Sequence, residues 1–190
     1  MSSNSSSNTL RRKTLLALAA GLLLPAFAGA STGMQVPGAA NAGAGLNSSP
    51  LTGLRLRGKG RFRRFGLLIY EATLWTSGET LQPPLALRLD YRRSLRGRAI
   101  AEASVDEMRP LVASGAPLAA WGEAMAGIFP DVRDGDHLLG EWREDGAFFF
   151  QEGRLIGAVR DPAFARAFFG IWLDPRTSAP ALRAALLGES

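Results

Sequence analysis

The stretch that decides the fold runs from His137 to Ser178 and reads HLLGEWREDGAFFFQEGRLIGAVRDPAFARAFFGIWLDPRTS. Two turn signals, Asp145-Gly146 and Glu152-Gly153, divide its first part into three short strand-forming runs. The third run leads into Asp161-Pro162, an N-cap residue followed by proline at the first helical position. An apolar helical face follows. This order predicts an antiparallel meander that ends in an amphipathic helix.

Three more strands are expected before this stretch. Residues 54–63 alternate apolar side chains with arginines, which is the period of a half-buried strand, and Gly58 and Gly60 indicate a bend or bulge in it. Residues 65–75 and 85–91 are the second and third predicted strands.

Helical patterns lie between and after the strands. The sequence S-V-D-E reads as a capping box, so a helix is expected to begin at Ser104 and to run towards residue 112. Residues 118–129 form a second helical stretch, and Ser178 is expected to cap a short last helix that Gly188 ends. Strands and helices in this order predict an α+β fold, with helices packed on one face of an antiparallel sheet.

The N-terminus has the layout of a secretory signal peptide, which we assign to residues 1–30. A basic cluster at 11–13 precedes the apolar run 14–28, which has about 15 residues where a membrane-spanning helix needs about 20. Small residues then offer an A-x-A cleavage site. Residues 31–50 are rich in Gly, Ala and Ser and are expected to be a disordered linker before a single domain at 51–190. The predicted location is the periplasm, with no membrane span left after cleavage.

Charge and cysteine content exclude several classes of function. Loss of the three basic residues of the signal peptide leaves 19 of the 22 basic residues against 17 acidic ones, so the formal charge falls from +5 to +2. This balance does not favour nucleic-acid binding. The chain has no cysteine, which excludes disulfides, thiolate metal sites and cysteine catalysis.

No pattern in the chain predicts a metal or a cofactor. His137 is the single histidine, at the point where a loop enters a strand. Asp131, Asp134 and Asp136 lack the alternating spacing of a calcium loop and are expected to belong to a turn with aspartate caps.

The candidate ligand-binding residues are Arg61, Arg63 and Tyr70. An arginine and a tyrosine facing an apolar cavity would hold a carboxylate or phenolate by charge-assisted hydrogen bonds. The alternative is that the arginines line the solvated side of a strand and that Tyr70 is a core residue with a backbone acceptor.

Four segments, at 58–75, 89–104, 128–138 and 161–178, resemble the bacterial branch of the chalcone isomerase-like family. The likeness extends over about residues 51–188. It implies an open-faced β-sandwich, in which a large antiparallel sheet carries helices on one face with a cleft between the layers. The family includes plant enzymes that close chalcones to flavanones, plastid fatty-acid binders, and members without known activity.

The resemblance carries over residue by residue only in part. Tyr70 matches the tyrosine with which the fatty-acid binders hold a carboxylate. The family's arginine position falls on Phe62, between Arg61 and Arg63. The enzymes' catalytic tyrosine falls on Ile100 and their asparagine near Glu107, so two polar groups of the enzymes are absent.

Three functions follow from these observations. The first is an exported, non-catalytic binder of a small amphipathic ligand such as a fatty acid. The second is an isomerase, an intramolecular lyase acting on a chalcone-like or enone substrate, in which Arg61 or Arg63 stabilises the developing oxyanion. The third is a partner-binding protein whose cleft is filled by Trp121, Phe168 and Trp172.

Overall fold

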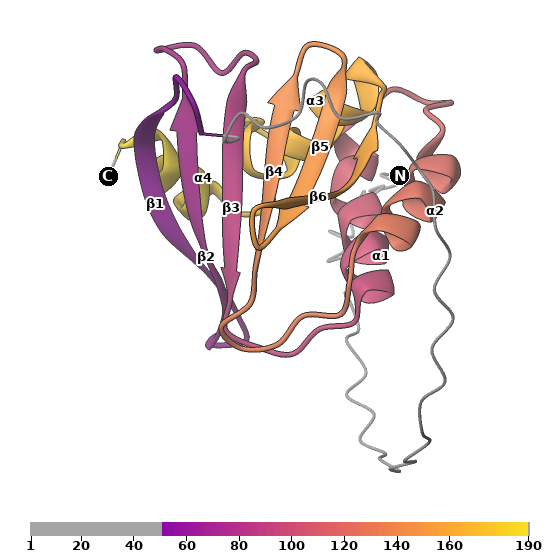
Figure 1. Cartoon of the computed structure of the whole chain (residues 1–190), viewed down its shortest axis with the longest axis horizontal. Coiled ribbons are helices and arrows are strands. Elements are labelled where there is room, and N and C mark those ends of the chain that lie inside the picture. The colour runs from indigo at the N-terminus through magenta and orange to yellow at the C-terminus, as the bar shows by residue number, and fades with distance from the viewer. Residues whose placement is uncertain (1–50, 190) are drawn as a thin grey trace, which may run out of the picture. The chain divides into compact units, whose positions relative to one another are not determined.

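A computed structural model describes residues 51–189. In this part of the chain six strands form one antiparallel sheet in which each strand pairs with its neighbours in the sequence (Figure 1). The strands are β1 (Arg55–Arg64), β2 (Leu67–Thr76), β3 (Leu85–Tyr91), β4 (His137–Arg143), β5 (Gly146–Gln151) and β6 (Arg154–Val159). The predicted meander is therefore confirmed, and it extends through the whole sheet.

Helices cover one face of this sheet. They are α1 (Gly97–Met108), the short 3-10 helix η1 (Arg109–Leu111), α2 (Leu118–Ile128), α3 (Pro162–Leu173) and α4 (Pro180–Leu187). Helix α3 packs on β4 and β5, α4 on β1 and β2, and α2 on β6, while α1 lies against α2 and α3. Figure 1 shows α3 and α4 behind the sheet. The predicted α+β architecture, an open-faced sandwich, is confirmed.

The main hydrophobic core lies between the sheet and the helices. Strand residues such as Leu74, Leu87 and Phe149 meet Phe164 and Phe168 of α3 there. A smaller cluster occupies the opposite face, and its buried members are Ala86, Leu139, Phe148 and Phe150. Because successive side chains of a strand point to opposite faces, the run of three phenylalanines in β5 contributes to both clusters.

The first two strands depart from regular pairing. Register shifts occur between Leu56 and Gly58 and again between Phe62 and Arg63, which confirms the predicted irregularity near the glycines. The second strand begins at Leu67, two residues later than predicted, because Phe65 and Gly66 form the turn, with φ of 50° and 78°.

Helix α1 begins at Gly97, so the predicted start at Ser104 is wrong. The Ser104 hydroxyl instead donates to the carbonyl of Ile100 within the helix, at 2.8 Å. The Gly97 N–H donates to the Asp131 carboxylate at 2.9 Å, and a Cβ on Gly97 would lie 2.0 Å from the Phe129 carbonyl oxygen. The start is thus fixed by a segment distant in sequence, which a local capping pattern does not reveal.

The predicted start of α3 is confirmed. The Asp161 carboxylate accepts from the backbone N–H groups of Ala163 and Phe164, as an N-cap does. Its second oxygen accepts from the indole N–H of Trp121 at 3.0 Å, so this cap also ties α2 to α3.

The last helix was predicted with one wrong detail. Ala179, not Ser178, is the N-cap residue, and Pro180 takes the first helical position. The Thr177 hydroxyl accepts from the Ala179 N–H at 3.2 Å. Gly188 ends the helix in the left-handed conformation with φ of 72°, as predicted.

The predicted signal peptide and linker, residues 1–50, lie outside the described residues. Between residues 51 and 189 there is no helix with both the length and the apolar character needed to cross a membrane.

Candidate functional site

Tyr70 lies on the helix-facing side of β2 and is the polar centre of the candidate site. Its ring stacks on Phe62 of the paired strand β1, with centroids 5.0 Å apart, and meets Tyr91 of β3 edge-on at 6.2 Å. Its hydroxyl accepts a hydrogen bond from the indole N–H of Trp172 in α3 at 3.0 Å. Three strands and one helix therefore position this hydroxyl.

Burial keeps this hydroxyl protonated. Desolvation raises the pKa of Tyr70 far above its ordinary value, and the Glu107 carboxylate adds to the increase, whereas the hydrogen bond from Trp172 lowers the pKa in part. The pKa of Tyr91 is raised in the same direction, again mainly by burial. Within residues 51–189 the Tyr70 hydroxyl accepts from Trp172 and donates to no described acceptor.

Glu107 of α1 is the charged group that influences Tyr70 through space. Its carboxylate accepts a hydrogen bond from the Ser178 hydroxyl at 2.6 Å, which joins α1 to the segment between α3 and α4. Ile100, on the same helix, packs against the hydrophobic core. The two positions where the resemblance places the enzymes' tyrosine and asparagine thus hold a core aliphatic residue and a helix-anchoring carboxylate.

Arg61 lies on the opposite side of β1 from Phe62. Its guanidinium donates to the Glu71 carboxylate at 3.0 Å, and the Arg61 side chain is 67% exposed. Arg92 binds the other oxygen of the same carboxylate at 2.9 Å. These two hydrogen bonds, from Arg92 and then Arg61, hold the pKa of Glu71 below its usual range.

Arg63 is also exposed. Its guanidinium donates to the Gly66 carbonyl at 3.1 Å, across the turn between β1 and β2. The structure therefore does not bring either candidate arginine to Tyr70. The side chain that does reach Tyr70 from β1 is Phe62, at the position where the resemblance expects the cation.

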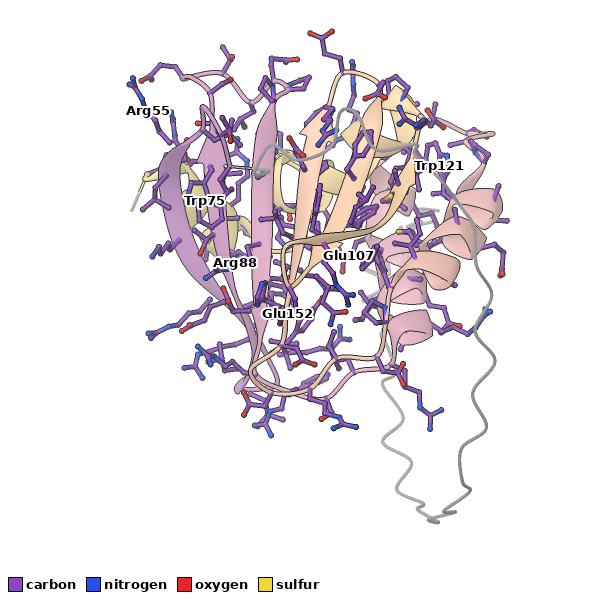
Figure 2. The ribbon with its side chains drawn as sticks, viewed as in Figure 1. Arg55, Trp75, Arg88, Glu107, Trp121 and Glu152 are labelled. Carbon is purple, nitrogen blue, oxygen red and sulfur yellow. The ribbon has the colours of Figure 1, made fainter. Side chains whose placement is uncertain are left out.

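Aromatic side chains continue from Tyr70 through the space between sheet and helices. Trp172 meets Phe168 at 5.4 Å, and Phe168 meets Phe149 of β5 at 5.2 Å. Phe164 and Trp121 extend the chain of rings to α2, at 5.6 and 5.7 Å. Trp121, labelled beside α2 in Figure 2, is buried like Phe168 and Trp172. The site is thus an apolar layer with the Tyr70 hydroxyl near its β1–β2 side.

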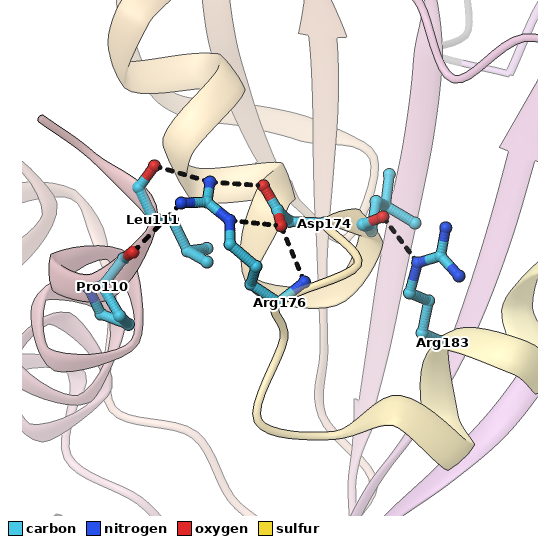
Figure 3. A network of polar contacts seen from close by, with 6 residues as sticks. Pro110, Leu111, Asp174, Arg176 and Arg183 are labelled. Carbon is cyan, nitrogen blue, oxygen red and sulfur yellow. Dashed lines mark hydrogen bonds and ion pairs between the residues drawn. The ribbon is translucent and has the colours of Figure 1, made fainter.

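The motif that follows α3 has a structural role (Figure 3). Arg176 holds the Asp174 carboxylate with two guanidinium nitrogens, at 2.9 and 3.0 Å. It also donates to the carbonyls of Pro110 and Leu111 at 3.3 and 3.0 Å. Since Asp174 follows α3 directly and the two carbonyls belong to η1, one guanidinium fastens these elements together. Hydrogen bonding to Arg176 lowers the pKa of Asp174.

The remaining sequence candidates take structural positions. Asp131 caps α1, and Asp136 accepts from the Arg133 N–H at 2.8 Å within the turn before β4. His137 is half-buried at the start of β4. In the described part of the chain no three metal-ligating side chains gather into a possible ion site.

Two partners of Tyr70 were missed by reasoning from the sequence. Trp172 lies 102 residues away along the chain, so no local pattern links the two side chains. Phe62 could have been found from strand parity alone, because Phe62 and Tyr70 face each other across β1 and β2 and so share a face.

Comparison of sequences finds a relative of this chain but no matching family. No family model matches the chain. An uncharacterised protein of Haemophilus influenzae is 27% identical over 125 residues, which cover 64% of this chain and 62% of that relative. The chain therefore matches less than two thirds of the relative's length.

A solved structure gives the class of fold. The crystal structure of a fatty-acid-binding protein of Arabidopsis thaliana matches with a TM-score of 0.56, covering 72% of this chain and 88% of that chain at 13% sequence identity. The six-stranded sheet with its helices therefore has the chalcone isomerase-like fold.

Proposed function

We propose that this protein is a non-catalytic binder of a small amphipathic ligand, such as a fatty acid, which lies between the sheet and the helices. The observation that carries the proposal is the Tyr70 hydroxyl, which keeps a proton that no described acceptor takes. A ligand headgroup with an acceptor oxygen matches this donor.

The chemistry of the layer supports an apolar ligand body. From Trp172, which donates to Tyr70, aromatic side chains extend along α3 to Trp121 with ring centroids 5.4 to 5.7 Å apart. Aromatic and aliphatic walls with few polar groups are typical of lipid and small-molecule sites. The Arabidopsis protein that shares the fold is named as a fatty-acid-binding protein.

The headgroup would be held without a cation. Phe62 occupies the position next to Tyr70, and Arg61 is engaged by Glu71 on the other side of the strand. The binding energy at the head then comes from the tyrosine hydrogen bond. In the isomerase alternative, Arg61 or Arg63 would stabilise the developing oxyanion. Since neither arginine reaches Tyr70, their placement favours a binder over that enzyme.

Calorimetric titration of the full chain with laurate tests the proposal. Tyr70→Phe removes the donor and is expected to weaken binding about 3- to 10-fold, the value of one hydrogen bond. Arg61→Ala is the matched control from the other side of the same strand pair and should bind like wild type. Absence of saturable binding would contradict the proposal. So would weaker binding in Arg61→Ala together with unchanged binding in Tyr70→Phe.

A partner-binding protein whose layer is filled by its own side chains is the second candidate. It is favoured by the close aromatic packing, in which Phe168 alone meets Phe149, Phe164 and Trp172 at 5.2 to 5.6 Å. Failure to take up any fatty acid would favour this candidate.

Export to the periplasm is part of the proposal. It depends on residues 1–30, whose basic cluster and short apolar run have the layout of a cleaved signal peptide. Fractionation of the producing cells, with N-terminal sequencing of the product, tests it.

A further inference from the structure

The turn between β1 and β2 exposes an aromatic side chain in an unusual backbone conformation. Phe65 is 83% exposed, and its φ of 50° lies in the left-handed region. Residues with short polar side chains, or glycine, usually take such a position. Leu67, directly after the turn, is 52% exposed. The hairpin therefore presents two large apolar side chains to solvent at its end.

Arginines surround this apolar tip. Arg63 folds back onto the Gly66 carbonyl, and the Arg64 guanidinium lies over the Phe65 ring at 5.3 Å. Arg61 of β1 and Arg92, just after β3, bind the two oxygens of the Glu71 carboxylate. This arrangement places guanidinium groups beside the exposed ring.

Two acidic groups at this end of the sheet are bound by arginines. Glu71 is bound by Arg61 and Arg92, and Asp90 by Arg88 at 3.0 Å. Asp134 also influences the pKa of Arg92. The tip itself, residues 63–67, carries two arginines and no acid.

The hairpin between β5 and β6 provides a comparison within the molecule. Its turn has the same backbone form, with φ of 50° at Glu152 and 72° at Gly153. Each strand of a meander reverses direction, so this turn lies at the same end of the strands as the Phe65 turn, and it joins the last two strands of the sheet where the Phe65 turn joins the first two. Here the left-handed position holds a charged glutamate. The backbone form therefore does not require an aromatic residue.

We infer that the β1–β2 hairpin docks on an anionic lipid bilayer, with Phe65 and Leu67 entering the headgroup boundary and the arginines binding lipid phosphates. An amphipathic surface that combines apolar side chains with arginines gains from both burial and charge at such a membrane. The inference goes beyond ligand binding, and its test needs no fatty acid.

Because the chain has no cysteine, a single cysteine can carry an environment-sensitive fluorophore at a chosen place. The full chains Phe65→Cys and Glu152→Cys, each labelled with a nitrobenzoxadiazole dye, form a matched pair with the same turn geometry. Each is mixed with vesicles of phosphatidylcholine containing 0 or about 30% phosphatidylglycerol, a range in which polybasic surfaces respond to lipid charge.

We expect a blue shift and increased emission at position 65 with the anionic vesicles, and little change at position 152. Any membrane binding by residues 1–50 is common to both chains, so the difference reports on the hairpins. No response at 65, or equal responses at 65 and 152, would overturn the inference. So would an equal response at 65 to heparin, which would assign the patch to soluble polyanions.

The unlabelled variant Phe65→Ser measures the contribution of the ring. Its partition onto the anionic vesicles should fall about 10-fold in co-sedimentation, since much of one phenylalanine is buried on docking. Leu155→Ser, from an exposed position on β6, is the control and should partition like wild type. Equal partition of Phe65→Ser and wild type would count against docking through this tip.

Discussion

The two sides of the β1–β2 strand pair are adjacent in sequence and opposite in chemistry. On the side facing the helices, Phe62 stacks on Tyr70 and Trp172 donates to the tyrosine hydroxyl. One residue away on each strand, Arg61 binds Glu71 in contact with solvent. Strand parity therefore decides which residue faces the helices, since a shift of one residue moves a side chain to the other face.

The largest expected effect comes from the helix side of this comparison. Trp172→Ala removes a buried ring that packs on Phe168 and removes the partner of the Tyr70 hydroxyl. Its free energy of unfolding should fall by about 3–5 kcal/mol. Urea denaturation followed by circular dichroism measures this. If Arg61→Ala lowered the free energy of unfolding by a similar amount, the two sides of the strand pair would contribute equally to stability.

Alkaline titration tests whether water reaches the tyrosines on the helix-facing side of the sheet. The chain has two tyrosines, and burial raises the pKa of both in the folded state above the ordinary value of 10. Folding therefore favours the neutral form, and the stability that this contributes is complete below the unfolded pKa and is lost as the pH rises above it.

Absorbance at 295 nm should accordingly show no tyrosinate in the native protein near pH 10, and should increase only with unfolding. The control is the same titration in denaturant, where both groups should titrate near their ordinary pKa. Reversible ionisation of one tyrosine near pH 10 in the folded protein would show that Tyr70 or Tyr91 is in contact with water.

Phe62→Arg sharpens the comparison by placing a cation beside Tyr70. We expect a loss of about 2 kcal/mol or more in stability, because the stacked ring is lost and a charge is partly desolvated. Affinity for laurate relative to dodecanol should rise, since the guanidinium would pair with the carboxylate. Calorimetry with both ligands checks this, and an unchanged ratio would show that the headgroup does not lie near position 62.

Much of the fold could be predicted from the sequence because its signals are local. The boundaries of β3, the Asp161 cap of α3 and the Gly188 end of α4 depend on a few neighbouring residues. The start of α1 could not be predicted, because Gly97 is held by Asp131 from a distant segment.

The candidate site was predicted only in part for the same reason. Tyr70 lies on the helix-facing side, but its partner Trp172 comes from the other end of the domain. The sequence left open whether Arg61 and Arg63 face the cavity or solvent, because the side that each residue faces follows from its pairing across the strands. Arg61 pairs with Glu71, and Phe62 pairs with Tyr70.

Tyr70→Phe should have a moderate effect on stability. It retains the stacked ring and removes the acceptor of the Trp172 N–H, which costs about 1 kcal/mol. Thermal or urea unfolding measures the change, with Tyr91→Phe as the control for a buried tyrosine of the same sheet. No change in stability would indicate that the Trp172 N–H finds another acceptor.

The smallest expected effect belongs to the solvent side. The pKa of Glu71 is lowered in the folded state by Arg92 and Arg61, so its contribution is present above the ordinary glutamate pKa of 4.5 and is lost as the pH falls through the lowered value. Because the carboxylate is in partial contact with solvent, Glu71→Gln should match wild type in stability at pH 7 within experimental error. A large loss at pH 7, measured by urea unfolding, would show that the ion pairs hold the strands together.

The most direct test of the central claim, that Tyr70 and not an arginine holds the ligand's polar head, is a crystal structure of the full chain with bound laurate. The expected result is a carboxyl oxygen about 2.7 Å from the Tyr70 hydroxyl, with the alkyl chain between the sheet and α3. A carboxylate bound by Arg61 or Arg63 on the solvent side would contradict it.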